Sequence, residues 1–238
     1  MPAPAPDQVE VVELRRYVLE PGCREELLEL FEDVFLEPLE EAGMRVLGHF
    51  RDLEDPNLFV WLRGFRDMPS RRAALEAFYD GDVWLRHRDA ANATMVDSDD
   101  VLLLRPAAGR PLADGAGSDD PPGLVVATVW PLAGPVSQEV ISLFADEVVP
   151  LLEEAGAAHA GLLVTETSPN DFPRLPVREG EHVVVTLGRF ADEEAHEAHV
   201  AARGRSRRWR ELENALRPRL AGALEVHRLA PAARSRLR

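Results

Sequence analysis

The sequence contains no lysine, and all 27 basic residues among its 238 are arginines. This absence excludes enzymes that bind a carbonyl substrate or pyridoxal phosphate through a lysine Schiff base. It also excludes P-loop enzymes, which place a lysine beside the phosphates. The single cysteine, Cys23, rules out an internal disulfide and a zinc ribbon, and it fits a reducing compartment.

Long hydrophobic runs are missing as well. The longest weakly polar run, Gly123–Val136, contains prolines and is too short to span a bilayer. The first residues, MPAPAPDQ, have neither the apolar core nor the basic flank of a signal peptide. A formal net charge of −15 opposes binding to nucleic acid or to an anionic membrane. We therefore expect a cytoplasmic protein that does not insert into membranes.

The chain carries an internal repeat. Leu30–Gly43 and Leu143–Gly156 agree at eight of fourteen positions, with an offset of 113 residues. Further along, an offset of 125 residues relates five identical pairs: Leu62/Leu187, Phe65/Phe190, Asp67/Asp192, Trp84/Trp209 and Pro106/Pro231. An insertion of twelve residues in the proline-rich stretch TSPNDFPRLPVREGE reconciles the two offsets. The sequence therefore predicts two copies of one unit.

Each copy reads as strand, helix, two strands, helix, strand. Pro38 should kink the last turn of the first predicted helix, and Gly43 should end it. In the first copy we expect strands at Val9–Leu19, Arg45–Arg51, Leu58–Phe65 and Val101–Leu104, and helices at Arg24–Ala42 and Pro69–Met95, the latter interrupted near Asp80 and Gly81. In the second copy we expect strands at Leu124–Trp130, Ala160–Thr165, His182–Leu187 and Leu224–Arg228, and helices at Ser137–Ala155 and Glu193–Leu216.

These elements set the expected organisation. It consists of a disordered tail (1–8), a first βαββαβ unit (9–106), a linker (107–122), a diverged second unit (123–231) and a basic tail (232–238).

The strand LFVWLRGF is apolar on both faces, whereas a sheet with helices on one side normally leaves its other face polar. The favoured fold class is α+β, with two tandem ferredoxin-like units whose sheets pack together as an intramolecular dimeric α+β barrel. The alternatives are two ferredoxin-like domains that meet elsewhere, or units that each pair with another chain.

The first copy resembles the NIPSNAP family. The resemblance is carried by VELRRYVLEPG, LFEDVFLEPLEEAG, WLRGF, the run VWLRHRDAANATM and DSDDVLLL, over about Val9 to Pro106. It implies a dimeric α+β barrel of undefined biochemical activity. The wider barrel class includes cofactor-independent monooxygenases, haem-binding enzymes and small-ligand binders, which place the ligand between sheet and helices or inside the barrel.

The stretch HRDAANATM holds the candidate site. It is no kinase catalytic loop, because Asn92 follows Asp89 by three residues rather than five, and the glycine-rich loop and DFG are absent. On a helix, Trp84, Arg88, Ala91 and Met95 form one core-facing stripe. At the offset of 125, His87, Arg88, Asp89 and Asn92 become Leu212, Glu213, Asn214 and Arg217, so the polar set belongs to the first copy alone.

Three other patterns are weaker indications of a functional site. A Cys23 thiol activated at a helix start is a possibility, but a tolerated structural cysteine is favoured. His196 and His199 have the spacing of two metal ligands, but no third ligand can be named, and a solvated helix face is favoured. The arginine-rich run around Trp209 indicates an exposed face rather than a nucleic-acid site.

The sequence thus predicts a small-molecule-binding protein with one pocket in the first copy, without a metal or cofactor. The predicted ligand-binding residues are Tyr17, Trp61, Trp84, His87, Arg88 and Asn92. The alternatives are a non-enzymatic protein-interaction scaffold and a cofactor-independent monooxygenase-like enzyme. In such an enzyme His87 would be the acid or base, and the catalytic candidates are His87, Arg88, Asp89 and Asn92. We expect a monomer or a weak homodimer.

Overall fold

The computed structural model describes residues 9–107, 112 and 123–238. The predicted tail 1–8 and nearly all of the predicted linker 107–122 lie outside these residues. The described chain groups into two compact units. The first contains residues 9–105, 166–179 and 231–236, and the second contains the remainder. Two segments from the second half of the sequence therefore belong to the first unit.

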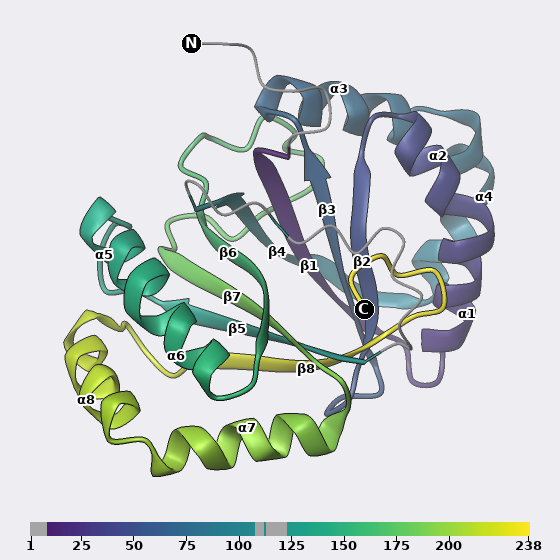
Figure 1. Cartoon of the computed structure of the whole chain (residues 1–238). Coiled ribbons are helices and arrows are strands. Elements are labelled where there is room, and N and C mark those ends of the chain that lie inside the picture. The colour runs from purple at the N-terminus through teal and green to yellow at the C-terminus, as the bar shows by residue number, and fades with distance from the viewer. Residues whose placement is uncertain (1–8, 108–111, 113–122) are drawn as a thin grey trace. The chain divides into compact units, whose positions relative to one another are not determined.

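The first unit is a four-stranded antiparallel sheet with its helices on one face (Figure 1). The strands are ordered β4–β1–β3–β2. In chain order its elements are β1 (Val11–Leu19), α1 (Arg24–Leu30), η1 (Phe31–Phe35), α2 (Leu36–Glu41), β2 (Arg45–Asp52), β3 (Leu58–Phe65), α3 (Met68–Tyr79), α4 (Asp82–Ala93) and β4 (Met95–Pro106).

The second unit repeats this arrangement with the strand order β8–β5–β7–β6. Its elements are β5 (Leu124–Pro131), α5 (Gln138–Leu143), η2 (Phe144–Val148), α6 (Val149–Glu154), β6 (Ala158–Thr165), β7 (Val183–Phe190), α7 (Glu193–Arg205), α8 (Arg207–Leu216), η3 (Arg217–Arg219) and β8 (Glu225–Pro231). The predicted fold class, α+β with two tandem ferredoxin-like βαββαβ units, is confirmed.

Equivalent residues have equivalent local roles in the two units. Asp67 caps α3 by accepting a hydrogen bond from the backbone N–H of Ser70, and Asp192 caps α7 by accepting one from Ala195. Gly43 and Gly156 each follow the end of a helix with a positive φ, of 98° and 109°. Glycine adopts this left-handed conformation without steric cost, which explains why both helices stop there.

Each first helix also contains a π-turn at the same place in the repeat. Leu36 donates its backbone N–H to the carbonyl of Phe31, and Val149 donates to that of Phe144. The extra residue in such a turn shifts the phase of the helix that follows. The irregularity therefore begins well before Pro38, where the sequence predicted only a kink. Phe31 and Phe35, at its two ends, are both buried.

Besides shifts of a few residues at several ends, two elements differ clearly from the prediction. The acidic stretch DSDD, which precedes the predicted strand Val101–Leu104, lies within β4, which begins at Met95. Arg16 of β1 holds this stretch to the sheet through an ion pair with Asp100, at 2.8 Å. The predicted continuous helix at 193–216 breaks at Ser206, whose side chain accepts a hydrogen bond from the backbone N–H of Trp209 and so caps α8.

The core of the first unit lies between the sheet and its helices. Phe59, Trp61 and Phe65 of β3 belong to this core, and the rings of Phe59 and Trp61 pack against that of Phe31. On the opposite face of β3, Val60 and Leu62 are buried as well, in agreement with the two apolar faces seen in the sequence. In the part of the chain that the structure describes, no helix is long and apolar enough to cross a membrane.

Candidate functional site

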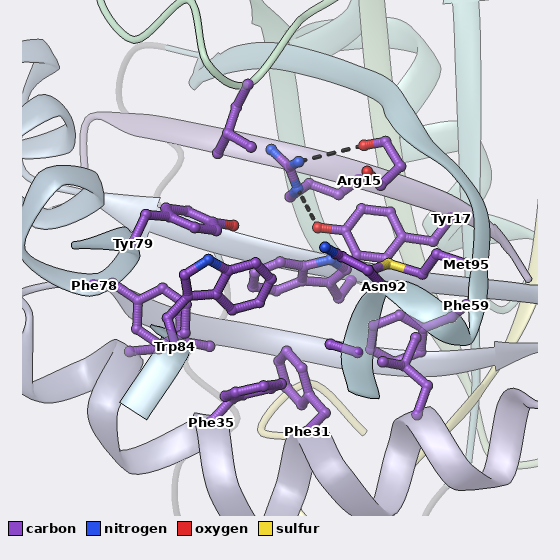
Figure 2. Close-up of a pocket in the computed structure, with 16 residues that line it drawn as sticks. Arg15, Tyr17, Phe31, Phe35, Phe59, Phe78, Tyr79, Trp84, Asn92 and Met95 are labelled. Carbon is purple, nitrogen blue, oxygen red and sulfur yellow. Dashed lines mark hydrogen bonds between the residues drawn. The ribbon is translucent and has the colours of Figure 1, made fainter. Parts of the chain in front are cut away.

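A cavity of about 120 Å³ lies in the first unit, on the helix-covered face of its sheet (Figure 2). Strands β1, β3 and β4, all the helices of this unit and the segment 166–179 contribute to its wall. Its lining residues are Arg15, Tyr17, Leu27, Phe31, Phe35, Leu39, Phe59, Trp61, Phe78, Tyr79, Trp84, Ala91, Asn92, Met95, Ser98 and Leu175. Asn92 is exposed, so the cavity reaches the surface beside it.

Half of these lining residues are aromatic, in a chain with only 6% aromatic residues. They include both tyrosines of the chain and two of its four tryptophans. Their rings meet mostly edge to face, with centroids 5.1 Å apart for Phe31 and Trp61 and 4.9 Å apart for Tyr79 and Trp84. This geometry holds rings in fixed orientations. The walls therefore suit a flat, apolar molecule.

The polar end of the cavity is formed by Arg15 and Tyr17 of β1. Arg15 donates from Nε to the Tyr17 hydroxyl at 2.9 Å and from Nη1 to Glu13 at 2.6 Å. A longer bond, of 3.4 Å, runs from Nη2 to the carbonyl of Ser98. The hydroxyls of Tyr17 and Tyr79 point toward each other from opposite sides of the cavity, near Arg15 (Figure 2).

Behind Arg15 lies a fully buried charge cluster centred on Glu13 of β1. Its carboxylate accepts hydrogen bonds from Arg63 of β3 at 2.8 Å and from Arg71 of α3 at 2.7 Å, besides that from Arg15. Burial alone would raise the pKa of Glu13, but Arg63, Arg15 and Arg71 together hold this pKa well below its usual range. Glu13 is therefore ionised at neutral pH.

Two donors that β1 and β3 present to the cavity have no acceptor among the described residues. The indole N–H of Trp61 is buried without a partner. The Tyr17 hydroxyl accepts from Arg15, but its own proton is given to no described group. Burial raises the pKa of Tyr17, against the opposing effect of Arg15, so the phenol stays protonated at neutral pH. Unpaired buried donors of this kind are costly unless something accepts from them.

One side of the cavity is covered by residues 166–179, the stretch in which the sequence placed the twelve-residue insertion. Leu175 lines the cavity, and the ring of Phe172 stacks on Tyr79 with centroids 6.1 Å apart. Arg71 donates to Asp171 at 2.6 Å and to the side chain of Asn170 at 3.1 Å. We call residues 166–179 the cover segment.

The structure brings together four of the predicted site residues. Tyr17, Trp61, Trp84 and Asn92 all line the cavity. His87 is half-buried with its ring against that of Phe35, at 6.4 Å, and does not line the cavity.

Arg88 and Asp89 also lie away from the cavity. Their side chains are 52% and 94% exposed, and they face each other at 3.5 Å on the outer side of α4. The expectation that Arg88 shares the core-facing stripe with Trp84 and Ala91 is therefore wrong. A catalytic role for His87, Arg88, Asp89 or Asn92 stays a prediction.

Sequence reasoning missed the charge cluster, although a signal for it was present. Glu13 and Arg15 alternate within the otherwise apolar strand VVELRRYVL, and Arg63 interrupts LFVWLRGF. Residues i and i+2 of a strand share a face, so Glu13, Arg15 and Tyr17 had to lie side by side. Charged residues on the same strand face as a buried tyrosine indicate a buried polar network.

The second unit lacks this chemistry at equivalent positions. By the repeat offsets, Glu13 and Arg15 correspond to Val126 and Thr128, and Ala91 corresponds to Leu216. Trp130 and Thr186 replace Tyr17 and Trp61, and they hydrogen-bond to each other at 3.2 Å. Leu216 packs into the same hydrophobic cluster as Trp130 and Trp209. The cavity's polar end is therefore no requirement of the fold.

The remaining sequence candidates have structural explanations. His199 is buried rather than solvated, with its ring 5.0 Å from that of Phe190, and its neighbour His196 also packs on Phe190. Burial, with a contribution from Arg203, lowers the pKa of His199 to about 4. Trp209 is buried beneath the guanidinium of Arg203, at 4.2 Å. Cys23 is a half-buried free thiol. Among the described residues, no three His, Cys, Asp or Glu side chains are grouped to hold a metal ion.

Comparison with known proteins identifies the first unit. The NIPSNAP family model matches residues 12–110, which span β1 to β4 and carry nearly all of the cavity wall. We call this part of the chain the NIPSNAP domain, after the family whose model it matches. No curated protein matches the chain. A NIPSNAP-like domain protein from Burkholderia xenovorans is 24% identical over 44% of this chain and 90% of its own, with a TM-score of 0.40.

Two further solved structures resemble the NIPSNAP domain and the second unit together. An anthrone oxidase-like protein is 15% identical over 99% of this chain and 97% of its own, with a TM-score of 0.59. A candidate monooxygenase from Lactobacillus acidophilus NCFM is 13% identical over 94% of both chains, with a TM-score of 0.57. At these identities the likeness shows a shared fold and leaves the activity of this chain open.

Proposed function

We propose that the protein binds a small aromatic molecule in the cavity of its NIPSNAP domain. The observation that carries this proposal is the composition of the cavity wall, where aromatic rings surround an open space beside an arginine and unpaired donors. Ligand sites are typically apolar hollows with a few fixed polar groups. A dry cavity of roughly 150 Å³ accepts a single benzene ring, so about 120 Å³ fits a ligand of similar size.

In this proposal Trp61 and Trp84 form the apolar walls, and Tyr17 and Asn92 supply hydrogen bonds. The comparison between the units supports this, because the second unit has Leu216 where the NIPSNAP domain has Ala91. A larger side chain at this position fills space in the same fold. Of the three alanines at 90, 91 and 93 of α4, only Ala91 lines the cavity, and its short side chain leaves space there for a ligand. The free thiol of Cys23 is compatible with the proposed cytoplasmic location.

The test replaces Ala91 by leucine, the residue at the equivalent position of the second unit. Ala91→Leu places the side chain of the second unit into the cavity, whereas Ala90→Leu makes the same change on the exposed side of α4. Binding of one-ring aromatic compounds is followed by ligand-detected NMR, and folding by thermal melting. We expect binding by the natural protein and by Ala90→Leu, and loss of binding in Ala91→Leu.

If Ala91→Leu has a much lower melting temperature than the natural protein, the smaller substitution Ala91→Val replaces it in the binding test. A graded loss from alanine to valine is then the expected result. Equal binding by all folded variants would contradict the proposal, as would no binding of any aromatic compound by the natural protein.

A further inference from the structure

The charge cluster at the polar end of the cavity is not neutral. Arg15, Arg63 and Arg71 are each at most 1% exposed, and they share the carboxylates of Glu13 and Asp171. Three guanidinium groups against two carboxylates leave one positive charge in excess. Arginine cannot release its proton in a protein, so this charge persists at every physiological pH. A buried net charge is costly unless a counter-charge approaches it.

The excess charge reaches the cavity through the pair Arg15 and Tyr17. Arg15 donates to the oxygen of Tyr17, which directs the hydroxyl proton of Tyr17 away from the guanidinium. A hydroxyl that accepts a hydrogen bond from a cation becomes a stronger donor itself. Since Tyr17 lines the cavity, its O–H is a polarised donor for whatever lies there.

A second donor lies next to it. The ring of Trp61 meets that of Tyr17 edge to face at 6.1 Å, and its buried indole N–H has no acceptor among the described residues. Both groups donate, and the cavity wall beside them presents no carboxylate. An ionised oxygen would accept from both donors and offset the positive charge behind them.

We infer that the ligand is an aromatic anion, whose ionised oxygen accepts hydrogen bonds from the Tyr17 hydroxyl and the Trp61 indole while its ring lies between the aromatic walls. An aryl carboxylate and a phenolate share this chemistry. The inference rests on the proposed function, because it names the ligand class of the same cavity. It adds charge selectivity, which the aromatic walls alone would not give.

The test compares two aromatic anions, benzoate and pentafluorophenolate, which is ionised at neutral pH, with two neutral compounds. Toluene has a shape similar to that of benzoate and no charge, and benzamide is polar and neutral. Affinities are measured calorimetrically at neutral pH for the natural protein and for Tyr17→Phe and Trp61→Phe. Both substitutions keep an aromatic ring and remove one donor. Trp130→Phe, at the position of the second unit equivalent to Tyr17, is the matched control.

We expect the natural protein to bind benzoate more tightly than benzamide or toluene. A hydrogen bond to a charged group is worth about 1.5–3 kcal/mol, so each cavity variant should weaken benzoate binding about tenfold or more. Toluene binding should change by less than about threefold in the same variants, and Trp130→Phe should change neither.

The outcomes separate the inference from the proposal beneath it. If toluene binds as tightly as benzoate, or if the two cavity variants weaken both compounds equally, the inference is wrong and the proposed function stands. If a phenolate binds and benzoate does not, the anion class holds and carboxylates are excluded as the source of the charge. If none of these compounds binds to the natural protein, both the inference and the proposed function are wrong.

Discussion

Arg71 of α3 donates a hydrogen bond to Asp171 of the cover segment at 2.6 Å, although the two residues are separated by 100 positions in the sequence. The same guanidinium donates to Glu13, which in turn binds Arg15 at the polar end of the cavity. Arg71 is thus the link between the buried charge cluster and the segment that covers the cavity. The repeat places His196 at the equivalent position of the second unit, so this link is particular to the NIPSNAP domain.

The substitution Asp171→Asn tests that link. It keeps the size of the side chain and removes the charge that faces Arg71, whose own side chain is fully buried. We expect a loss of about 1–3 kcal/mol in the free energy of unfolding, as for other charged hydrogen bonds. Hydrogen exchange of residues 166–179 should become faster, because fewer bonds then hold the cover segment.

Asp80→Asn is the matched control for this substitution. Asp80 pairs with Arg174 of the same cover segment, but both side chains are more than half exposed. Exposed ion pairs contribute little, so a loss below about 0.5 kcal/mol is expected. Equal effects of the two substitutions on hydrogen exchange would show that the buried link has no special part in holding the segment.

Glu13→Gln tests the charge cluster through its dependence on pH. The pKa of Glu13 is lowered in the folded protein, so the unfolded chain takes up the proton first as the pH falls. The stability that Glu13 contributes is therefore present above about pH 5 and declines below it. Glu13→Gln removes this contribution, and we expect a less stable protein whose stability changes less between about pH 5 and pH 3.

Chemical denaturation at a series of pH values measures this difference directly. Glu76→Gln provides the comparison, because Glu76 forms an exposed pair with Arg72 on the surface of α3. This control should keep the acid dependence of the natural protein. Parallel curves for Glu13→Gln and the natural protein would mean that folding does not change the pKa of Glu13.

His199 provides a second test of pH dependence, because its pKa in the folded protein is lowered to a definite value. Burial and the neighbouring Arg203 lower its pKa to about 4, so it stays neutral in the folded protein at neutral pH. The unfolded chain is protonated at higher pH, and stability is therefore lost as the pH falls through about 6.5 toward 4. An NMR titration of the histidine ring protons should find one histidine with a pKa near 4, whose signal is absent in His199→Phe. Seven histidines that all titrate near 6.5 would contradict the packing of His199 on Phe190.

The tandem arrangement of the two units predicts the oligomeric state of the protein. Because one chain supplies both βαββαβ units, we predict a monomer or a weak dimer. Light scattering should therefore give a mass near 26.4 kDa in dilute solution. A mass of two chains that persists on dilution would overturn this prediction.

Much of the fold could be predicted from the sequence because matching residues in the two copies support the same assignment of helices and strands. The repeat pairs Asp67 with Asp192, and it pairs Gly43, the predicted end of the first helix, with Gly156. In the structure both aspartates cap a helix, and both glycines follow the end of one. The π-turn at Phe31 could not be foreseen, because an extra residue in a helix leaves the residue types unchanged and alters only the hydrogen-bond pattern.

The candidate site was predicted in part. Helical spacing placed Trp84 and Ala91 correctly at the cavity, but it also placed Arg88 there, whose side chain is half exposed beside Asp89 on the outer side of α4. The cover segment lay beyond prediction for a different reason. Spacing along a helix or strand indicates which residues share a face, but it gives no information about where an inserted loop folds back in space.

The location of a bound aromatic compound tests the central claim most directly. A crystal of the protein soaked with a brominated one-ring aromatic compound would reveal the bromine by its anomalous scattering. The account predicts one strong peak inside the NIPSNAP domain, among Phe31, Trp61 and Trp84, and no such peak in crystals of Ala91→Leu. A peak found only elsewhere, or an unchanged peak in Ala91→Leu, would contradict the assignment of this cavity as the ligand site.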